Sequence, residues 1–176
     1  MLSHAGLAKP VLVLLFCVGT WMSSCTPSFG APQPPSSVIQ RTLAYLKRDS
    51  DQLLHYYKKE EPGVLKQLDG QPYLPLLPCF TLHPEASNNI SVLQAHLESV
   101  KRLSNNQTTI DDIIKRLEDL KSHKIPKLNI SEPPQDSFKR KCFIMTVLVQ
   151  LSTCVTDTYE AFLKGWEAES RLEVFQ

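Results

Sequence analysis

The sequence predicts an all-α protein that folds as one four-helix bundle in up-up-down-down order. Three observations predict this fold class. Four stretches of the 176-residue chain repeat apolar residues at helical spacing. The connections after the first and the third stretch are long and rich in proline, and the connection between the second and the third is short. Two long crossovers let the first two helices run parallel, whereas an up-down-up-down bundle needs only short loops.

The first helix is expected to begin at Ser36 or Ser37, whose hydroxyl can accept a hydrogen bond from a free backbone N–H. It is expected to end at Pro62-Gly63, because proline and glycine stop a helix. Charged residues alternate with its apolar positions, which makes the helix amphipathic. The apolar stripe consists of Ile39, Leu43, Leu46, Leu53 and Tyr57.

The second and third helices are expected to be antiparallel neighbours, because only the polar residues 104–107 connect them. Before them, four prolines among residues 63–84 predict an extended connection. The third helix is expected to begin at Thr109, with Asp112 three residues later in a capping-box-like arrangement. The apolar positions are Ile90, Leu93, Leu97, Val100 and Leu103 in the second helix, and Ile110, Ile113, Ile114, Leu117 and Leu120 in the third.

A second proline-punctuated connection leads to the fourth helix. Asp136 can cap its start, and we expect it to run to about Trp166. Residues 142–149 are apolar almost all round, which predicts deep burial of this segment. The seam expected to face the other helices consists of Met145, Leu148, Val155, Tyr159, Phe162 and Trp166.

Residues 1–25 have the order of a secretory signal peptide: the cation Lys9, the apolar run 11–21, and small residues at 23–25. That run is too short to cross a bilayer, which takes about 20 apolar residues, although an uncleaved anchor is the alternative. We expect residues 26–36 to form a flexible leader, 37–166 the bundle and 167–176 a C-terminal tail. Because we expect no later stretch to hold the chain in a membrane, we predict a secreted, extracellular protein.

Charge and glycosylation motifs fit a secreted glycoprotein. Lys9 is the only charged side chain in the signal segment, so the remaining chain carries 18 cations and 18 acids. A neutral chain does not predict a nucleic-acid ligand, which favours a basic surplus. N-glycosylation sequons begin at Asn89, Asn106 and Asn129, all at expected helix edges or in loops.

The sequence offers no constellation for catalysis, a cofactor or a metal. Its histidines beyond the signal are scattered, without metal-ligand spacing, at His55, His83, His96 and His123. It carries no phosphate-binding glycine loop and no Gly-x-Ser-x-Gly motif. A small secreted enzyme would usually carry a denser disulfide frame than three cysteines can form. We therefore predict a protein that is not an enzyme.

The three cysteines beyond the signal can form one disulfide. Cys142 and Cys154 lie twelve residues apart on one expected helix, which is about 18 Å, whereas a disulfide tolerates at most about 7 Å between Cα atoms. Cys79 therefore pairs with one of them, unless all three are free thiols. Cys79 leads toward the second helix, at the end of the bundle that the later part of the fourth helix should reach. We predict a Cys79–Cys154 disulfide with Cys142 unpaired.

Several motifs recur in an order and spacing that resemble a known family. Each is weak alone, but together they are similar to the interleukin-31 family of interleukin-6 type helical cytokines, up to about Lys164. The segments Thr20-Trp21 and Ser28–Pro32 resemble rodent forms of this family. The motifs are Leu77–Cys79, Asn88–Ser91, Ile110–Ile114, Leu128–Pro133 and Phe143–Cys154.

The resemblance implies a long-chain cytokine whose function is receptor binding. A member of this family bridges two receptor chains, the interleukin-31 receptor alpha subunit and the oncostatin M receptor beta subunit. This pairing triggers kinase and transcription-factor signalling in the immune response, with inflammation of the skin and itch as outcomes. We expect the chain to act as a monomer, without direct membrane insertion and without a nucleic-acid partner.

The resemblance also implies three receptor-binding residues. The family's acid on the third helix falls on Asp112 and its polar position one turn later on Arg116. Both should point outward and meet the alpha subunit, although in isolation they are also an ordinary i, i+4 surface pair. On the first helix the register offers Ala44 or Tyr45 where an acid is expected. Lys141, near the start of the fourth helix, should meet the second receptor chain.

The chain departs from the family at one cysteine. Where the family has Cys-Lys-x-Phe, this chain reads Arg140-Lys141-Cys142-Phe143, which moves the cysteine by two residues and turns it about 200° around the helix. This departure argues against a family disulfide through that position and favours Cys79–Cys154.

Two other classes fit the same elements. One is a helical cytokine with a different receptor pair, and the other is a secreted carrier that holds a lipid between its helices. A carrier needs a cavity within the bundle, whereas bulky seam residues predict a filled core.

Overall fold

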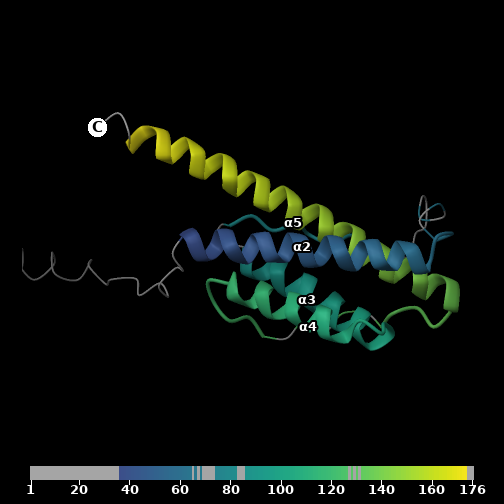
Figure 1. The fold of residues 1–176 in the computed structure, drawn as a ribbon. Coiled ribbons are helices and arrows are strands. Elements are labelled where there is room, and N and C mark those ends of the chain that lie inside the picture. Colours follow the sequence, from purple (N-terminus) through teal and green to yellow (C-terminus); the bar gives the residue numbers. More distant parts are fainter. Residues whose placement is uncertain are drawn as a thin grey trace, which may run out of the picture. The chain divides into compact units, whose positions relative to one another are not determined.

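The computed structural model describes residues 36–64, 66, 68, 74–82, 86–126, 128, 130 and 132–173, with side chains as far as Trp166. Within these residues the chain forms four helices and no strand, which confirms the expected all-α class (Figure 1). The expected signal peptide, nearly all of the leader and Asn129 lie outside the described residues. The helices are α2 (Ser36–Glu60), α3 (Ala86–Leu103), α4 (Gln107–Asp119) and α5 (Ser137–Glu173).

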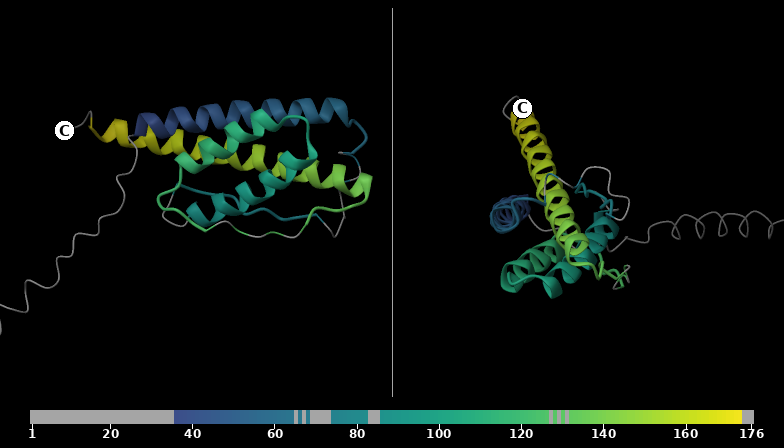
Figure 2. Two further views of the ribbon diagram at one scale, coloured as in Figure 1. Left: turned by 90° about the horizontal axis from the view of Figure 1, so that it is seen from below. Right: turned by 90° about the vertical axis from the view of Figure 1, so that its right-hand side faces the viewer.

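Helices α2 and α5 lie side by side and run in opposite directions (Figure 2). The Asp51 carboxylate of α2 accepts a hydrogen bond from the hydroxyl of Ser152 in the middle of α5. Glu61, directly after α2, forms an ion pair with Lys141 near the start of α5. As the residue number rises along α2, the contacted residue number on α5 falls, so the two helices are antiparallel.

Helices α3 and α4 form a second antiparallel pair. Ser87 at the start of α3 bonds to Ser122 after α4, and Lys101 at the end of α3 pairs with Asp111 at the start of α4. The short turn between the helices therefore has the role that the sequence predicts.

The order of the two pairs follows from contacts between α3 and α5. The start of α3 lies near Cys79, whose backbone oxygen accepts a hydrogen bond from Asn89, and Cys79 is bonded to Cys154 on α5. Further along α3, the His96 ring lies 6.2 Å from that of Phe143, which is earlier on α5. Helix α3 therefore runs opposite to α5 and parallel to α2. The up-up-down-down order is confirmed.

Helix boundaries differ from expectation at two places. Helix α4 begins at Gln107 rather than Thr109, and its N-cap residue Asn106 makes no side-chain capping bond. The capping box that Thr109 and Asp112 would form is therefore wrong, because both residues are already inside the helix. Helix α5 continues to Glu173, beyond Trp166. The residues after Trp166 include glutamate, alanine, arginine and leucine and no proline, so nothing in them stops a helix.

The start of α5 agrees with expectation. The Asp136 carboxylate accepts a hydrogen bond of 2.8 Å from the backbone N–H of Lys139. This bond satisfies one of the donors that the first turn of a helix leaves without an intrahelical partner.

All four helices contribute to one hydrophobic core. The expected stripe of α2 is buried at Leu43, Leu46, Leu53 and Tyr57, and residues 142–148 of α5 are buried all round. Burying each such leucine, isoleucine or phenylalanine side chain stabilises the fold by about 1.5–3 kcal/mol. The largest fully buried side chains are Phe80, Leu43, Leu46, Ile90, Leu93, Leu97, Ile110, Ile113, Leu117, Met145, Leu148 and Leu151.

Helix α5 corrects one expectation about membranes. Over Ser137–Trp166 it is long and apolar enough to cross a bilayer by length and composition, although we expected no such stretch after the signal. However, 67% of its apolar window is buried inside the bundle, where the helix packs against α2 and α3. The same apolar surface that would suit lipid is used here as protein core.

The connection between α2 and α3 is fixed to α5 by a disulfide and by side chains. Cys79 and Cys154 are joined, with Cα atoms 5.2 Å apart, and Cys142 is a buried free cysteine, which confirms the predicted pairing. One turn beyond Cys154, the hydroxyl of Thr158 donates a hydrogen bond of 2.7 Å to the backbone oxygen of Phe80. The extended segment 74–82 therefore lies along α5 and is held at several points.

Candidate receptor-contact surfaces

The residues implied on the third helix do not form a pair with each other. Asp112 is exposed on α4 and has no ion pair among those in the described part of the chain, whereas Arg116 is half-buried against α2. The Arg116 Nε lies 3.4 Å from Asp49 Oδ2, and its guanidinium carbon lies 4.8 Å from the centroid of the Tyr45 ring. The alternative of an i, i+4 surface pair is therefore wrong for Arg116, because a shielded carboxylate and a ring face on α2 are better partners than exposed Asp112.

Sequence reasoning overlooked an acid on the first helix, Asp49, which lies beside Arg116. It is 8% exposed, and its Oδ1 accepts hydrogen bonds from Arg48 Nε at 2.9 Å and Arg48 Nη2 at 2.7 Å. The two carboxylate oxygens thus face two different arginines. A signal was present in the sequence, because Asp49 lies between Leu46 and Leu53 on the apolar stripe, where an acid must have a partner if it is to be buried.

Tyr45 is enclosed by the same two arginines. The guanidinium carbon of Arg48 lies 5.0 Å from the ring centroid and that of Arg116 lies 4.8 Å from it, yet the residue remains 38% exposed. A tyrosine held by two cations presents a fixed aromatic surface, which is the type of residue that dominates binding energy in protein interfaces. We call Tyr45, Arg48, Asp49, Asp112 and Arg116 the α2/α4 surface.

Lys141 lies at a different place on the bundle. Its Nζ is 2.8 Å from both carboxylate oxygens of Glu61, and its side chain is 42% exposed. The hydroxyl of Tyr57 donates a hydrogen bond of 3.4 Å to the backbone oxygen of Lys141. Burial raises the pKa of Tyr57 strongly, and the nearby Glu61 carboxylate adds to this, so the phenol stays protonated and can donate. We call Tyr57, Glu61 and Lys141 the α5-start surface.

The two described glycosylation sequons lie at helix starts. Asn89, in the first turn of α3, donates a hydrogen bond of 2.8 Å from its side-chain nitrogen to the backbone oxygen of Cys79. An amide nitrogen that carries a glycan keeps one N–H, so a sugar there is compatible with this bond. Asn106 is the N-cap of α4, and its side chain makes no capping bond.

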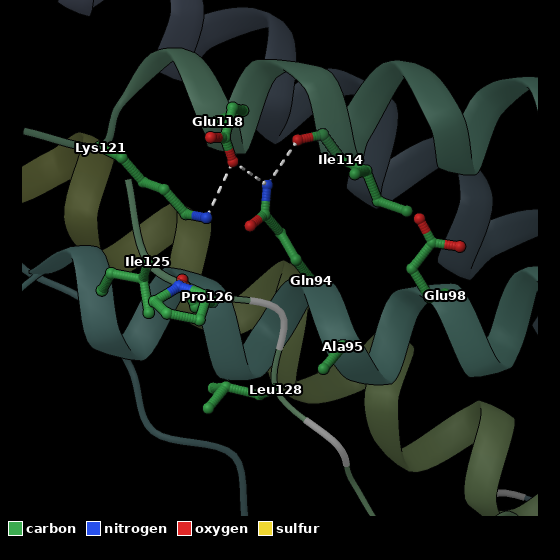
Figure 3. Close-up of a pocket in the computed structure, with 10 residues that line it drawn as sticks. Gln94, Ala95, Glu98, Ile114, Glu118, Lys121, Ile125, Pro126 and Leu128 are labelled. Carbon is green, nitrogen blue, oxygen red and sulfur yellow. Dashed lines mark hydrogen bonds and ion pairs between the residues drawn. The ribbon is translucent and has the colours of Figure 1, made fainter. Parts of the chain in front are cut away.

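A pocket of 240 Å³ lies between α3, α4 and the connection that follows α4 (Figure 3). Gln94 Nε2 donates to the backbone oxygen of Ile114 at 2.9 Å and to Glu118 Oε2 at 3.1 Å. Lys121 pairs with the same Glu118 carboxylate, and its hydrogen bond, despite partial burial, lowers the pKa of Glu118. These polar groups bind one another and hold α3 against α4. Within the described residues we find no cluster of histidine, cysteine and acids that could hold a metal.

Four helices in up-up-down-down order, two long connections and a hydrophobic core to which all four helices contribute place the chain in the class of long-chain helical cytokines. The sequence model of the Interleukin 31 family matches residues 28–161. Interleukin-31 of Mus musculus is 40% identical over 160 residues, which is 89% of this chain and 94% of that protein. Interleukin-31 of Homo sapiens is 34% identical over 167 residues, which is 94% of this chain and 96% of that protein. The chain therefore belongs to the interleukin-31 family. No solved structure matches it.

Proposed function

We propose that the chain is a secreted cytokine that bridges the interleukin-31 receptor alpha subunit and the oncostatin M receptor beta subunit. The α2/α4 surface would meet the alpha subunit and the α5-start surface the beta subunit. The resulting receptor pair would start kinase and transcription-factor signalling in immune, skin and itch responses. The chain itself would catalyse nothing.

The observation that carries the proposal is the separation of two charged surfaces on one rigid bundle. Tyr45 and Glu61 are 16 residues apart on or just after α2, which corresponds to about 24 Å along a helix. No residue belongs to both surfaces. A bundle built around one shared hydrophobic core deforms little, so the distance between the two surfaces stays constant. Two receptor chains bound to these surfaces would therefore be held at a fixed spacing.

Secretion is part of the proposal. Residues 1–25 would be removed as a signal peptide, and residues 26–36 would precede the bundle as a leader. N-terminal sequencing of protein from the culture medium should begin after residue 25, and an intact N-terminus would contradict the signal. Enzymatic removal of N-linked sugar should lower the apparent mass in more than one step, because Asn89, Asn106 and Asn129 are all candidate sites.

Receptor use can be tested on cells that express either receptor chain alone or both. We expect binding to cells with the alpha subunit alone, tighter binding to cells with both chains, and signalling only in the latter. Binding that needs neither chain would assign the protein to a different receptor pair. Extraction of a stoichiometric lipid from purified protein would favour the carrier class instead.

A further inference from the structure

A groove of 740 Å³ lies between the extended segment 74–82 and the second half of α5. Phe80, Leu82, Phe162 and Trp166 line it, and Trp166 is 43% exposed. On the other side of the disulfide, a hollow of 210 Å³ is lined by Leu77, Val149 and Thr153. Cys79 and Asp157 line both cavities, so the two cavities are neighbours along α5, and we call them together the link groove.

One wall of the link groove is held rigidly. The side-chain amide of Gln150 donates to the backbone oxygen of Pro75 at 2.8 Å and accepts from the backbone N–H of Leu77 at 2.6 Å. The disulfide and the bond from Thr158 to Phe80 fix the segment further along. A wall fixed in this way loses little conformational entropy when something binds to it.

Leu76 lies between the two clamped residues and is 92% exposed. A leucine that is almost entirely in water on a mobile loop would need no explanation. Here its neighbours on both sides are bound to Gln150, so the side chain is presented to solvent by a fixed backbone. Leu76 lines neither cavity, but it is the chain neighbour of Leu77, which lines the smaller one, and Trp166 lines the larger one. The two residues therefore offer exposed apolar positions, one beside each cavity.

Among the described residues that line the link groove, one is charged. This residue, Asp157, is exposed, and it makes no ion pair or hydrogen bond within the described residues. Apolar side chains lie on both sides of it. The complementary ligand therefore has a cation at its centre and apolar groups at its two ends.

The length of the groove indicates the kind of molecule that fits. From Val149 to Trp166 the groove follows α5 for 17 residues, or about 25 Å, which is the span of an extended peptide of about eight residues. We propose that the link groove binds an extended segment of a protein partner in which a lysine or arginine lies between apolar residues. The cation faces Asp157, and the apolar residues contact Leu76 and Trp166. This site shares no residue with the α2/α4 or α5-start surface and does not depend on the proposed function.

The test is selection of peptides on the full secreted protein. A phage-displayed library of random nonapeptides is selected on the wild-type chain and counter-selected on Asp157→Lys. We expect enrichment of sequences with a central lysine or arginine between apolar residues. Synthetic copies should shift the fluorescence of Trp166 to shorter wavelength. The chain has only one other tryptophan, Trp21, which lies in the expected signal, and a Trp21→Phe variant removes it if the signal is retained.

Matched variants decide whether the peptides occupy the link groove. Asp157→Lys and Leu76→Ser should each weaken binding about tenfold or more. Glu160→Lys, an exposed charge reversal on α5 outside the groove lining, should leave it unchanged. Circular dichroism must show all three variants folded, which their exposed positions favour. Failure to enrich such sequences, or equal binding by all three variants, would overturn the proposal. A dimer that Leu76→Ser dissociates in sedimentation would overturn it in favour of a second copy as the occupant.

Discussion

Arg116 of α4 contacts two residues of α2 at once, with its guanidinium over the ring of Tyr45 and its Nε 3.4 Å from the carboxylate of Asp49. A position that the family resemblance assigns to receptor binding is thus also a bridge between two helices. Any substitution of Arg116 alters both roles. The two roles must therefore be separated by a variant that changes one of them alone.

Replacing Arg116 with glutamate should destabilise the fold. The new carboxylate would face Asp49, whose side chain is only 11% exposed and whose remaining cation is Arg48. Because the Arg116 side chain is itself 30% exposed, solvent screening reduces the effect, and we expect a loss of about 1–2 kcal/mol in the free energy of unfolding. Chemical denaturation measures this. Arg41→Glu, an exposed charge reversal on α2, is the control and should change stability little.

Asp112→Lys should affect binding without affecting stability. Asp112 is exposed and holds no ion pair within the described residues, so its replacement disturbs no packing. If the α2/α4 surface meets the alpha subunit, reversal of this charge should weaken that binding about tenfold through like-charge repulsion or loss of a complementary pair. Surface plasmon resonance with the alpha-subunit ectodomain measures it. Unchanged affinity would remove Asp112 from the interface, whatever Arg116→Glu does.

The fold could be predicted from the sequence far better than this surface could. Apolar spacing and loop length depend on local sequence, and they gave the four helices and their order correctly. Of the segment 142–149 expected to be deeply buried, residues 142–148 are buried and Val149 is partly buried. The partner of Arg116 depends on how α2 and α4 are rotated against each other. That rotation is fixed by the packing of many core side chains. Sequence reasoning therefore found only Ala44 or Tyr45 where an acid is expected on the first helix, and it overlooked Asp49.

The end of α5 shows the opposite limitation. Proline and glycine patterns predict where a helix must stop, but the residues after Trp166 contain no such signal, and amphipathic spacing fades there. The helix continues to Glu173, and the residues after Trp166 include good helix formers such as glutamate, alanine, arginine and leucine.

Exchange of the two charges of the α5-start surface separates pairing from recognition. In Lys141→Glu alone, a carboxylate replaces the ammonium group that lies 2.8 Å from the Glu61 carboxylate, so the variant should lose some stability as well as beta-subunit binding. The double variant Lys141→Glu, Glu61→Lys restores an ion pair with reversed polarity. We expect it to recover the stability but not the binding, because position 141 then carries a glutamate where the beta subunit would require the lysine. If the double variant also recovers binding in a beta-subunit assay, Lys141 contributes to binding only by forming the ion pair with Glu61 and not by direct contact with the receptor.

Removal of the Cys79–Cys154 disulfide should destabilise the fold substantially. The bond closes a loop over a sequence separation of 75 residues, and the chain-entropy model assigns such a closure about 4 kcal/mol. The double variant Cys79→Ala, Cys154→Ala should show this loss in denaturation. Cys142→Ala, which trims a buried free cysteine, should cost less, about 1 kcal/mol. Non-reduced peptide mapping of the wild type should give a Cys79–Cys154 peptide, and a Cys79–Cys142 peptide would contradict both the pairing and the topology.

Acid stability should depend on Asp51, which joins α2 to α5. Partial burial raises the pKa of Asp51, but hydrogen bonds from Lys47 and Ser152 outweigh it and hold the pKa below its ordinary value of 3.8. A carboxyl with a lowered pKa in the folded state stabilises the fold above its unfolded pKa, and this contribution is lost as the pH falls through the folded pKa. Unfolding free energy should therefore decrease on acidification below about pH 4.

In Asp51→Asn the decrease should be smaller, by less than about 1 kcal/mol because the side chain is 43% exposed. Urea denaturation across this pH range measures the difference. Glu118→Gln, which removes a second carboxyl with a lowered pKa but leaves the α2–α5 contact intact, is the comparison. If the free energy of unfolding falls equally below about pH 4 in the wild type and in Asp51→Asn, the hydrogen bond between Asp51 and Ser152 does not contribute to the pH dependence of stability.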